Sequence, residues 1–368
     1  MAQLIKSLYI DAYRGIEELK LGNFGDINIL TGNNNSGKTS VLELIKGLLM
    51  PFQLNTWLRI GRRNNYSTYN RPSLFEEVLE LFPVDKDNME IKYSYIDENN
   101  KQTVIKLKAN LDIISLSKGE IDAIDSLGFH KYFEAEDPDD SIADGIKKLV
   151  VEFYKDGEII NTECIYDFQR KYSMFLDKDK ITREIIYISP EQHLTGNIFL
   201  SNVFDNPRLY QRMLEALKIF DEDILSINVD NDNNSVNGVI KLLSKKHNTA
   251  LPLNMYGDGM KKVLLLMSAL VACKDGILLL DEFETAIHTS AMLEIFTWII
   301  DVAKENNVQI FLTSHSDETI EKLITSTENT DAKVRLFTLY KEQGMNKVRN
   351  LEAKQALLFK KEMGLELR

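Results

Sequence analysis

The feature that most constrains this chain is a glycine-bearing loop near its start. Residues Gly32 to Thr39 fit the pattern G-x-x-x-x-G-K-[ST]. An apolar, β-branched run, Ile27 to Leu30, precedes the loop and predicts a short strand. An apolar helical pattern, Val41 to Leu49, follows the loop and stops before Pro51. Strand, loop and helix in this order predict a phosphate-binding loop and disfavour a chance glycine turn.

The residue types in this loop suit a nucleotide and Mg²⁺. The glycines let the backbone bend until its N–H groups converge on phosphate oxygens, and the helix N-terminus adds a favourable dipole. Lys38 is expected to neutralise the β- and γ-phosphates. The Thr39 hydroxyl is expected to hold Mg²⁺.

Two carboxylates follow a second apolar strand. Ile277 to Leu280 reads as a buried strand, and Asp281 and Glu282 come directly after it. Ligands of α/β sheets bind at the carboxyl ends of the strands, so these side chains are expected near the phosphates. Asp281 is predicted to hold Mg²⁺ through water, and Glu282 to polarise the attacking water. A helix N-cap is the alternative, which the presence of the phosphate loop disfavours.

A histidine follows a third apolar strand. His315 comes just past Val308 to Thr313, 34 residues after Asp281. A single histidine is more often structural than catalytic. Beside the two preceding motifs, however, this one is predicted to sense the γ-phosphate and orient water.

A further pair of glycines lies at the start of a predicted helix. Gly257, Asp258 and Gly259 precede the apolar helical pattern of Lys261 to Ala272. Exposed N–H groups at such a helix start can bind anions. A turn with an N-cap aspartate is the simpler interpretation of these three residues taken alone.

The remaining pattern predicts an α/β fold with a mostly parallel sheet. Apolar strands alternate with helices up to a last strand at Val334 to Tyr340, which a helix at Leu351 to Lys361 follows. Residues 51–180 differ from this pattern. They predict two antiparallel hairpins, at 89–109 and 149–166. We therefore expect a nucleotide-binding head from 1–50 and 181–368, with a β-rich and helical insertion at 51–180.

Composition excludes several classes of protein. Hydrophobic residues make up 44% and charged residues 27% of the 368-residue chain, which is ordinary globular composition. The net charge of −12 disfavours non-specific coating of nucleic acid. Cys164 and Cys273 are too few for a disulfide framework or a zinc cluster. No signal peptide is recognised, and the longest apolar run, Val263 to Cys273, is too short for a membrane span, so we expect a cytoplasmic protein without membrane contact.

One basic segment leaves nucleic-acid binding open. Arginines and aromatic residues interleave from Trp57 to Arg71, which predicts a surface loop. Aromatic and arginine side chains together can clamp nucleic acid. A solvated or partner-docking loop is the favoured interpretation.

The order of these motifs resembles the head domain of ABC-type ATPases. Within that class the chain is similar to the OLD-like and stand-alone AAA-type ATPases of anti-phage defence systems, such as the PARIS- and Septu-like ATPase subunits. The resemblance covers 1–50 and about 181–340. The segments that carry it are Tyr13 to Gly15, Gly32 to Ser40, Gly257 to Gly259, Asp281 to His288 and Thr313 to Ser316.

The resemblance implies roles for individual residues. Glu282 and His315 would be catalytic, and Thr39, Asp281 and Gln192 would serve the metal, although Gln192 is equally well an ordinary polar loop residue. Gly257, Asp258 and Gly259 would complete the site of a second subunit in a head-to-tail dimer. The residues that would contact ATP within one subunit are Arg14, Asn33, Asn34, Asn35, Ser36, Gly37, Lys38, Thr39 and Ser40.

The function implied is that of a slow, Mg²⁺-dependent ATPase switch. Its heads would form a homo-oligomer, at least a dimer, around ATP and would control a separate effector, a toxin or a nuclease. The 28 residues after Tyr340 are too few for a nuclease domain. A RecF-like DNA repair ATPase is the main alternative, and a scaffold that binds ATP without appreciable hydrolysis is a third. The lack of long heptad arrays disfavours the ATPases with long coiled-coil arms.

Overall fold

The structure is a computed structural model of the 368-residue chain. The residues that it describes are 3–61, 73–83, 89–125, 131–133, 137–170, 184–195, 198–230, 239–284, 289–328, 330–364 and 366–367.

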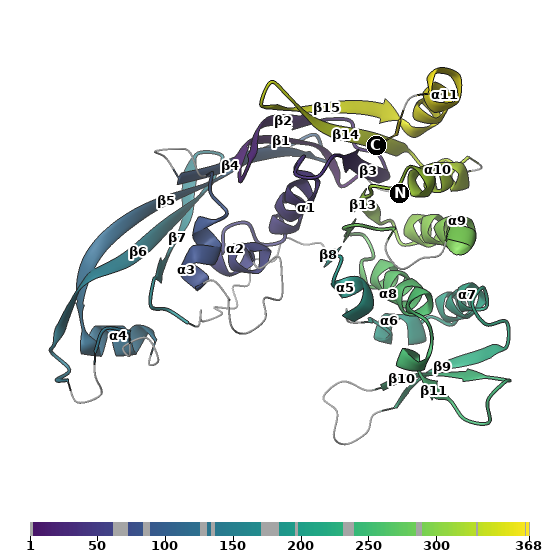
Figure 1. The fold of residues 1–368 in the computed structure, drawn as a ribbon, viewed down its shortest axis with the longest axis horizontal. Coiled ribbons are helices and arrows are strands. Elements are labelled where there is room, and N and C mark those ends of the chain that lie inside the picture. Colours follow the sequence, from purple (N-terminus) through teal and green to yellow (C-terminus); the bar gives the residue numbers. More distant parts are fainter. Residues whose placement is uncertain are drawn as a thin grey trace.

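A six-stranded sheet forms the centre of the head, in the order β15-β14-β3-β13-β12-β8 (Figure 1). Its strands are β3 (Ile27–Gly32), β8 (Ile185–Ile188), β12 (Ile277–Leu280), β13 (Gln309–Thr313), β14 (Val334–Glu342) and β15 (Met345–Glu352). All neighbouring strands run parallel except β15, which pairs antiparallel with β14. The predicted mostly parallel sheet is confirmed. The prediction that Val334 to Tyr340 is the last strand was wrong, because a further strand, β15, follows β14. The predicted C-terminal helix begins only after β15.

Both faces of this sheet are buried, which explains why its central strands are apolar throughout. Ile277 and Leu279 face one core and Leu278 and Leu280 face the other, since successive side chains of a strand point to opposite faces. Helix α1 (Lys38–Gly47) covers the first face. The helices that cover the second face are α7 (Pro207–Leu217), α8 (Asp258–Ala272), α9 (Thr289–Glu305), α10 (Asp317–Ser326) and α11 (Ala353–Met363).

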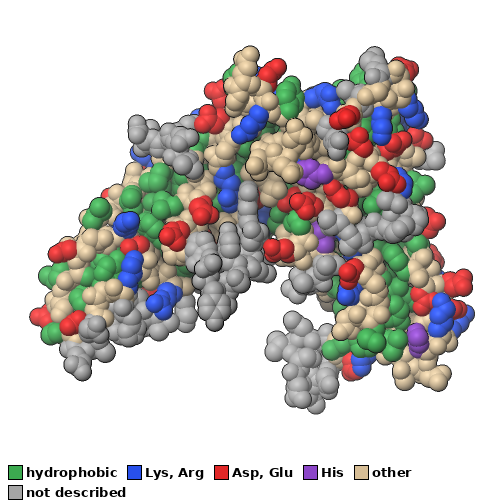
Figure 2. Space-filling view, in the orientation of Figure 1, with side chains coloured by type: hydrophobic (Ala, Val, Ile, Leu, Met, Phe, Trp, Pro, Cys, Tyr) green, Lys and Arg blue, Asp and Glu red, His purple; other side chains and the backbone are tan. Residues whose placement is uncertain are grey.

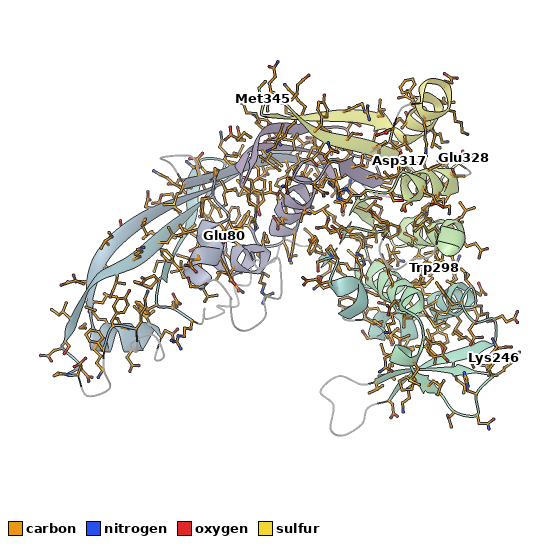
Figure 3. The ribbon with its side chains drawn as sticks, in the orientation of Figure 1. Glu80, Lys246, Trp298, Asp317, Glu328 and Met345 are labelled. Carbon is orange, nitrogen blue, oxygen red and sulfur yellow. The ribbon has the colours of Figure 1, made fainter. Side chains whose placement is uncertain are left out.

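Side-chain hydrogen bonds tie the helices of the second face together. The indole Nε1 of Trp298 on α9 donates to the carbonyl of Arg212 on α7, at 3.0 Å. Figure 3 labels Trp298 among these stacked helices. Two carboxylates of α9, Asp301 and Glu305, form ion pairs with the same Arg212 at 3.2 and 2.5 Å.

A second, antiparallel sheet extends away from the head, in the order β2-β1-β4-β5-β6-β7. Its strands are β1 (Ile5–Tyr13), β2 (Ile16–Leu21), β4 (Met89–Asp97), β5 (Gln102–Ser117), β6 (Ile142–Lys155) and β7 (Glu158–Tyr166). Both predicted hairpins are present in it, with β5 and β6 longer than predicted. Figure 1 shows β5, β6 and β7 reaching out as an arm that carries α4 (Lys118–Ile124) near its end. Figure 2 shows apolar, acidic and basic side chains intermixed over this arm.

The start of the basic segment is not a surface loop, which corrects the sequence-based expectation. Residues Leu54–Gly61 form helix α2, and Leu74–Leu79 form α3. Trp57 of α2 is fully buried, its ring lies 6.3 Å from those of Tyr13 and Tyr93, and its Nε1 donates to the Pro51 carbonyl. Trp57 therefore belongs to the core. The remaining arginines and tyrosines of the segment, from 62 to 71, lie outside the described residues.

A small lobe completes the head. It holds a three-stranded sheet and three short helices, namely β9 (Ile224–Asp230), β10 (Val239–Ser244), β11 (Leu251–Pro252), α5 (Gln192–Thr195), α6 (Ser201–Phe204) and η2 (Leu253–Met255). Within this sheet β10 pairs antiparallel with both β9 and β11. Among the helices that the structure describes, none is long and apolar enough to cross a membrane.

Candidate functional site

The predicted phosphate loop joins β3 to α1. Gly32 ends β3 with a φ of 132°, and a Cβ there would lie 2.0 Å from the Leu339 carbonyl oxygen of β14. Gly37 precedes α1 with a φ of 100°, and its Cβ would lie 2.7 Å from Ile16. Both positions need glycine because an L-residue is strained at these φ values and has no room. The two glycines thus allow the sharp turn that a phosphate-binding loop requires.

The loop lies at a cavity of about 750 Å³ that gathers most of the predicted site. Arg14, Asp281, Glu282 and His315 reach this cavity from three separate segments, although 267 residues separate Arg14 from Asp281 in the chain. The other lining residues are Gly15, Ile16, Asn34, Asn35, Ser36, Gly37, Lys38, Thr39, Ser40 and Lys341. A volume of this size lies within the range of small-molecule and cofactor sites.

The Lys38 ammonium lies against its own loop. Its Nζ donates to the carbonyls of Gly32 and Asn33, each at 2.9 Å. Burial lowers the pKa of Lys38, and the carboxylates of Asp281, Glu282 and Glu284 act in the opposite direction. These carboxylates therefore favour the charged form of Lys38. That form suits a phosphate ligand.

Two buried polar atoms at the cavity have no hydrogen-bond partner among the described residues. One is Oγ of Ser36 in the loop, and the other is Nη2 of Arg14. The rest of the Arg14 guanidinium is held in place, because its Nε pairs with Oε2 of Glu43 at 3.2 Å and donates to the Tyr13 hydroxyl at 3.2 Å. Buried polar groups are rarely left unsatisfied. A phosphate group in the cavity fits these two atoms.

Asp281 is oriented by two hydroxyl groups. Its Oδ1 accepts from Oγ1 of Thr313 at 2.5 Å, and its Oδ2 accepts from the Tyr187 hydroxyl at 3.1 Å. Each carboxylate oxygen keeps a free lone-pair direction. The hydroxyl of Thr39 lines the same cavity. Oxygen donors of this kind are the ligands that Mg²⁺ takes in nucleotide sites, usually together with water and phosphate.

Glu282 has a constrained backbone and an exposed side chain. Its φ is 49°, which is uncommon outside glycine, asparagine and aspartate. Its N–H donates to Oγ1 of Thr313 at 2.7 Å, and the next N–H, of Phe283, donates to the Thr313 carbonyl at 3.0 Å. Residues held in sparsely populated conformations persist where their surroundings fix them. Here the end of β13 fixes the loop that presents Glu282.

Thr313 is a functional candidate to which the sequence alone assigned no role. One hydroxyl both donates to Asp281 and accepts from Glu282, so it links the metal candidate to the water-polarising candidate. A threonine at the end of an otherwise apolar strand is the only signal in the sequence. His315, two residues later, receives its position from Glu284, whose Oε1 accepts from the His315 N–H at 2.7 Å.

We predict that Thr313→Val destabilises the chain and slows hydrolysis. The isosteric change leaves Oδ1 of Asp281 and the N–H of Glu282 without partners in a buried setting, at a cost of about 1–3 kcal/mol. Urea unfolding measures the loss. Thr31→Val on β3 is the matched control, since the Thr31 hydroxyl is buried without a partner among the described residues and its loss should be nearly neutral. Equal losses in both variants would refute the linking role of Thr313.

Five predicted residues are not among those that line the cavity. Asn33 lies in the phosphate loop, where its carbonyl accepts from Nζ of Lys38. Gln192 is exposed, and its Oε1 accepts from the Ser189 N–H at 3.1 Å, which closes its own turn. Gly257, Asp258 and Gly259 form the start of α8, where Gly257 and Asp258 are exposed. His288 and its preceding residues from Thr285 lie in 285–288, outside the described residues.

Two buried side chains contact the backbone of the loop that presents Glu282. His193 and Lys262 are both buried and were not predicted from the sequence. Nε2 of His193 lies 2.7 Å from the Asp281 carbonyl oxygen, and Nζ of Lys262 donates to the Phe283 carbonyl at 2.5 Å. Burial lowers the pKa of His193 to about 4 and that of Lys262 to about 7. The Glu284 carboxylate opposes the shift of the Lys262 pKa.

Sequence comparisons match the chain to one family model and to proteins of two organisms. Residues 180–321 match a family model described as an AAA domain, putative AbiEii toxin, type IV TA system. The chain is 25% identical over 344 residues to a protein of Helicobacter pylori named ATP/GTP phosphatase, and the match covers 87% of each chain. It is 32% identical over 114 residues to the uncharacterized protein MJECL11 of Methanocaldococcus jannaschii, which covers 30% of this chain and 98% of the other.

Comparison with solved structures shows that the chain has the fold of Smc head domains. An Smc head domain with an extended coiled coil from Pyrococcus furiosus, bound to the C-terminal domain of ScpA, superposes with a TM-score of 0.51 at 11% identity. That match covers 98% of this chain and 100% of the other. An SmcHead bound to the C-winged helix domain of ScpA gives a TM-score of 0.50 at 10% identity, covering 96% and 99%. At these identities the likeness concerns the fold.

Proposed function

We propose that this chain, an ATPase with an AAA-type domain and the fold of ABC-type ATPase heads, is a switch in which ATP joins two copies head to tail. The observation that carries the proposal is the distribution of the candidate residues. One set surrounds the cavity at the phosphate loop, and a second set lies exposed at the start of α8, outside that cavity. A second copy explains both sets, because the start of its α8 would lie against the cavity of the first copy.

Within one head, the cavity residues bind ATP and prepare it for hydrolysis. Lys38 transfers its hydrogen bonds from loop carbonyls to the β- and γ-phosphates, and Ser36 and Arg14 gain partners there. Thr39 and Asp281 would hold Mg²⁺, which would neutralise phosphate charge. Glu282 takes the proton of the attacking water, and His315 orients that water.

Between heads, the start of α8 completes the site. The N–H groups of Gly257 to Gly259 face the γ-phosphate held by the partner copy, with the positive end of the α8 dipole behind them. Such preformed donors stabilise charge that develops during phosphoryl transfer. Hydrolysis then removes the group that holds the two heads together.

The role in the cell is proposed as control of a separate effector, a toxin or a nuclease, in anti-phage defence. The match to a domain described for a type IV toxin–antitoxin system supports this direction. A RecF-like role in DNA repair gains no support from the described part of the basic segment, because Trp57 is a core residue. A toxin or nuclease gene beside this gene would favour effector control, and replication genes would favour repair.

We predict that Gly257→Trp blocks ATP-dependent association of the heads. A Cβ at Gly257 meets no atom within 4 Å, so the indole is tolerated by the single chain and obstructs only the approach of a second one. Sedimentation velocity with Mg-ATP is expected to show a dimer for the unmodified protein and a monomer for the variant. Gly22→Trp is the matched control, because Gly22 is equally open and has no left-handed φ. A Gly257→Trp protein that dimerises like the control would contradict the head-to-tail arrangement.

A further inference from the structure

Lys262 is the most unusual side chain of α8. The residues around it, Val263 to Met267, are buried and apolar, and Lys262 itself is 0% exposed. Burying an ammonium group costs free energy, so an apolar residue of similar length would suit this core better. Nζ of Lys262 donates a hydrogen bond to the carbonyl oxygen of Phe283, which offsets part of this cost. Its Nζ also lies 5.4 Å from the centre of the Phe283 ring.

Phe283 directly follows Glu282, so Lys262 acts on the loop that presents this carboxylate. The two carbonyls that flank the Glu282 residue are both anchored by buried side chains, Asp281 by His193 and Phe283 by Lys262. The N–H of Glu282 is held by Thr313. Contacts from three different segments therefore fix a backbone whose φ is 49°, and they include the Phe283 N–H bond to the Thr313 carbonyl. Removing one of them frees the direction in which the Glu282 side chain points.

The three anchors differ in where they come from. Thr313 belongs to β13 of the central sheet, and His193 to the short helix α5. Lys262 belongs to the first turns of α8, five residues after Gly257, which corresponds to roughly 7 Å along a helix. An α-helix transmits a displacement of its first turn over this distance with little loss. Of the three anchors, Lys262 alone lies on the helix whose start is exposed toward a second copy.

We propose that Lys262 is a positioning residue that couples the start of α8 to Glu282. This inference rests on the proposed function, in which Gly257 meets the partner's nucleotide and Glu282 polarises water. When the start of α8 engages the second head, its displacement reaches the Phe283 carbonyl through the Lys262 ammonium. Glu282 then takes up the orientation that accepts a proton from water. Each head therefore hydrolyses ATP only when the start of its own α8 contacts the other head. Dimer formation thus raises the turnover of each head.

The test is Lys262→Met, which keeps the length and apolar stem of the side chain and removes the ammonium. We expect ATP affinity within about twofold of the unmodified protein and an unchanged ATP-dependent dimer by sedimentation. We expect kcat to fall about tenfold or more, with little change in KM, because the hydrogen bond from the Lys262 ammonium to the Phe283 carbonyl is lost at the loop. Turnover per head should no longer rise with protein concentration as dimers form. Lys262→Arg, which keeps a charged donor, should restore part of kcat.

Lys304→Met on α9 is the control for removal of a lysine charge, since Lys304 lies on an exposed surface and pairs with Asp331 at 3.9 Å. If Lys262→Met does not fold, Lys262→Leu replaces it with the same expected result. Turnover that still rises with dimer formation in a folded variant would overturn the coupling. Glu282→Gln separates this outcome from failure of the proposed function. If Glu282→Gln retains full turnover, the assignment of Glu282 as the base fails. If Glu282→Gln loses turnover while Lys262→Met keeps the turnover of the unmodified protein, only the coupling through Lys262 is rejected.

Discussion

Lys38→Ala is expected to weaken ATP binding by about 100-fold or more. The ammonium would make at least two charge-assisted hydrogen bonds to the phosphates, each worth about 1.5–3 kcal/mol, and each 1.4 kcal/mol corresponds to a tenfold change in affinity. In the structure its Nζ already lies within the phosphate loop, at hydrogen-bond distance from the Gly32 and Asn33 carbonyls. Titration with a fluorescent ATP analogue, with Mg²⁺ present, measures the change.

The control for this variant is Lys347→Ala. Lys347 is exposed on β15 and does not line the cavity, so its removal changes the net charge equally. Circular dichroism and thermal unfolding verify that both variants are folded. A folded Lys38→Ala protein with the affinity of the Lys347→Ala protein would refute the assignment of the nucleotide site.

Glu282→Gln is expected to lower kcat by about 10²–10⁴-fold while ATP binding persists. General bases contribute effects of this size. The amide keeps the size of the side chain and loses its ability to take a proton from water. The backbone N–H bond of Glu282 to Thr313 does not depend on the side chain, so the loop should keep its shape. Steady-state phosphate release and nucleotide titration, measured on the same sample, separate the two effects.

Asp281→Asn provides the comparison, because Asp281 is proposed to serve the metal. Its hydroxyl partners, Thr313 and Tyr187, donate to the carboxylate, so an amide nitrogen would lose one of these bonds. We expect this variant to require more Mg²⁺ for the same ATP affinity, whereas Glu282→Gln should not. If Glu282→Gln hydrolyses ATP at the rate of the unmodified protein, another residue must be the base.

The nucleotide-binding part of the molecule could be predicted well from the sequence, because it depends on local patterns. A glycine loop between an apolar strand and an amphipathic helix allows few alternatives, and β3, Gly32, Gly37 and α1 appear as expected. Three apolar strands, each followed by polar residues, predicted that Asp281 and His315 would meet at one edge of the sheet. Both line the cavity with the phosphate loop.

The supporting residues could not be predicted, because their roles depend on contacts distant in sequence. His193 and Asp281 are 88 residues apart, and Lys262 and Phe283 are 21 apart. A lysine in an apolar helix resembles an exposed residue until the helix is known to be covered on all sides. Trp57 shows the opposite error, since arginines and tyrosines nearby suggested a surface while tertiary packing buries it.

One edge strand in each of the two large sheets, β15 and β2, was not predicted. β15 is short of apolar residues, with the pattern Met-Asn-Lys-Val-Arg-Asn-Leu-Glu, because it lies at the sheet edge and pairs on one side only. β2 has a similar mixed pattern at the edge of the antiparallel sheet. Edge strands need few buried side chains, so hydrophobic periodicity indicates them weakly.

The measurement that tests the central claim most directly mixes two inactive proteins. Lys38→Ala lacks its own phosphate contact but keeps the start of α8, and Gly257→Trp has the converse defect. If each site is composed of two heads, a mixed dimer holds one intact site, formed by the phosphate loop of the Gly257→Trp chain and the α8 start of the Lys38→Ala chain. At the other site the indole meets the phosphate loop of the Lys38→Ala chain, which holds no ATP, whereas in a dimer of two Gly257→Trp chains it would meet bound ATP at both sites. The account predicts that hydrolysis reappears on mixing and scales with the fraction of mixed dimers determined by native mass spectrometry. Mixed dimers that form and remain inactive would contradict it.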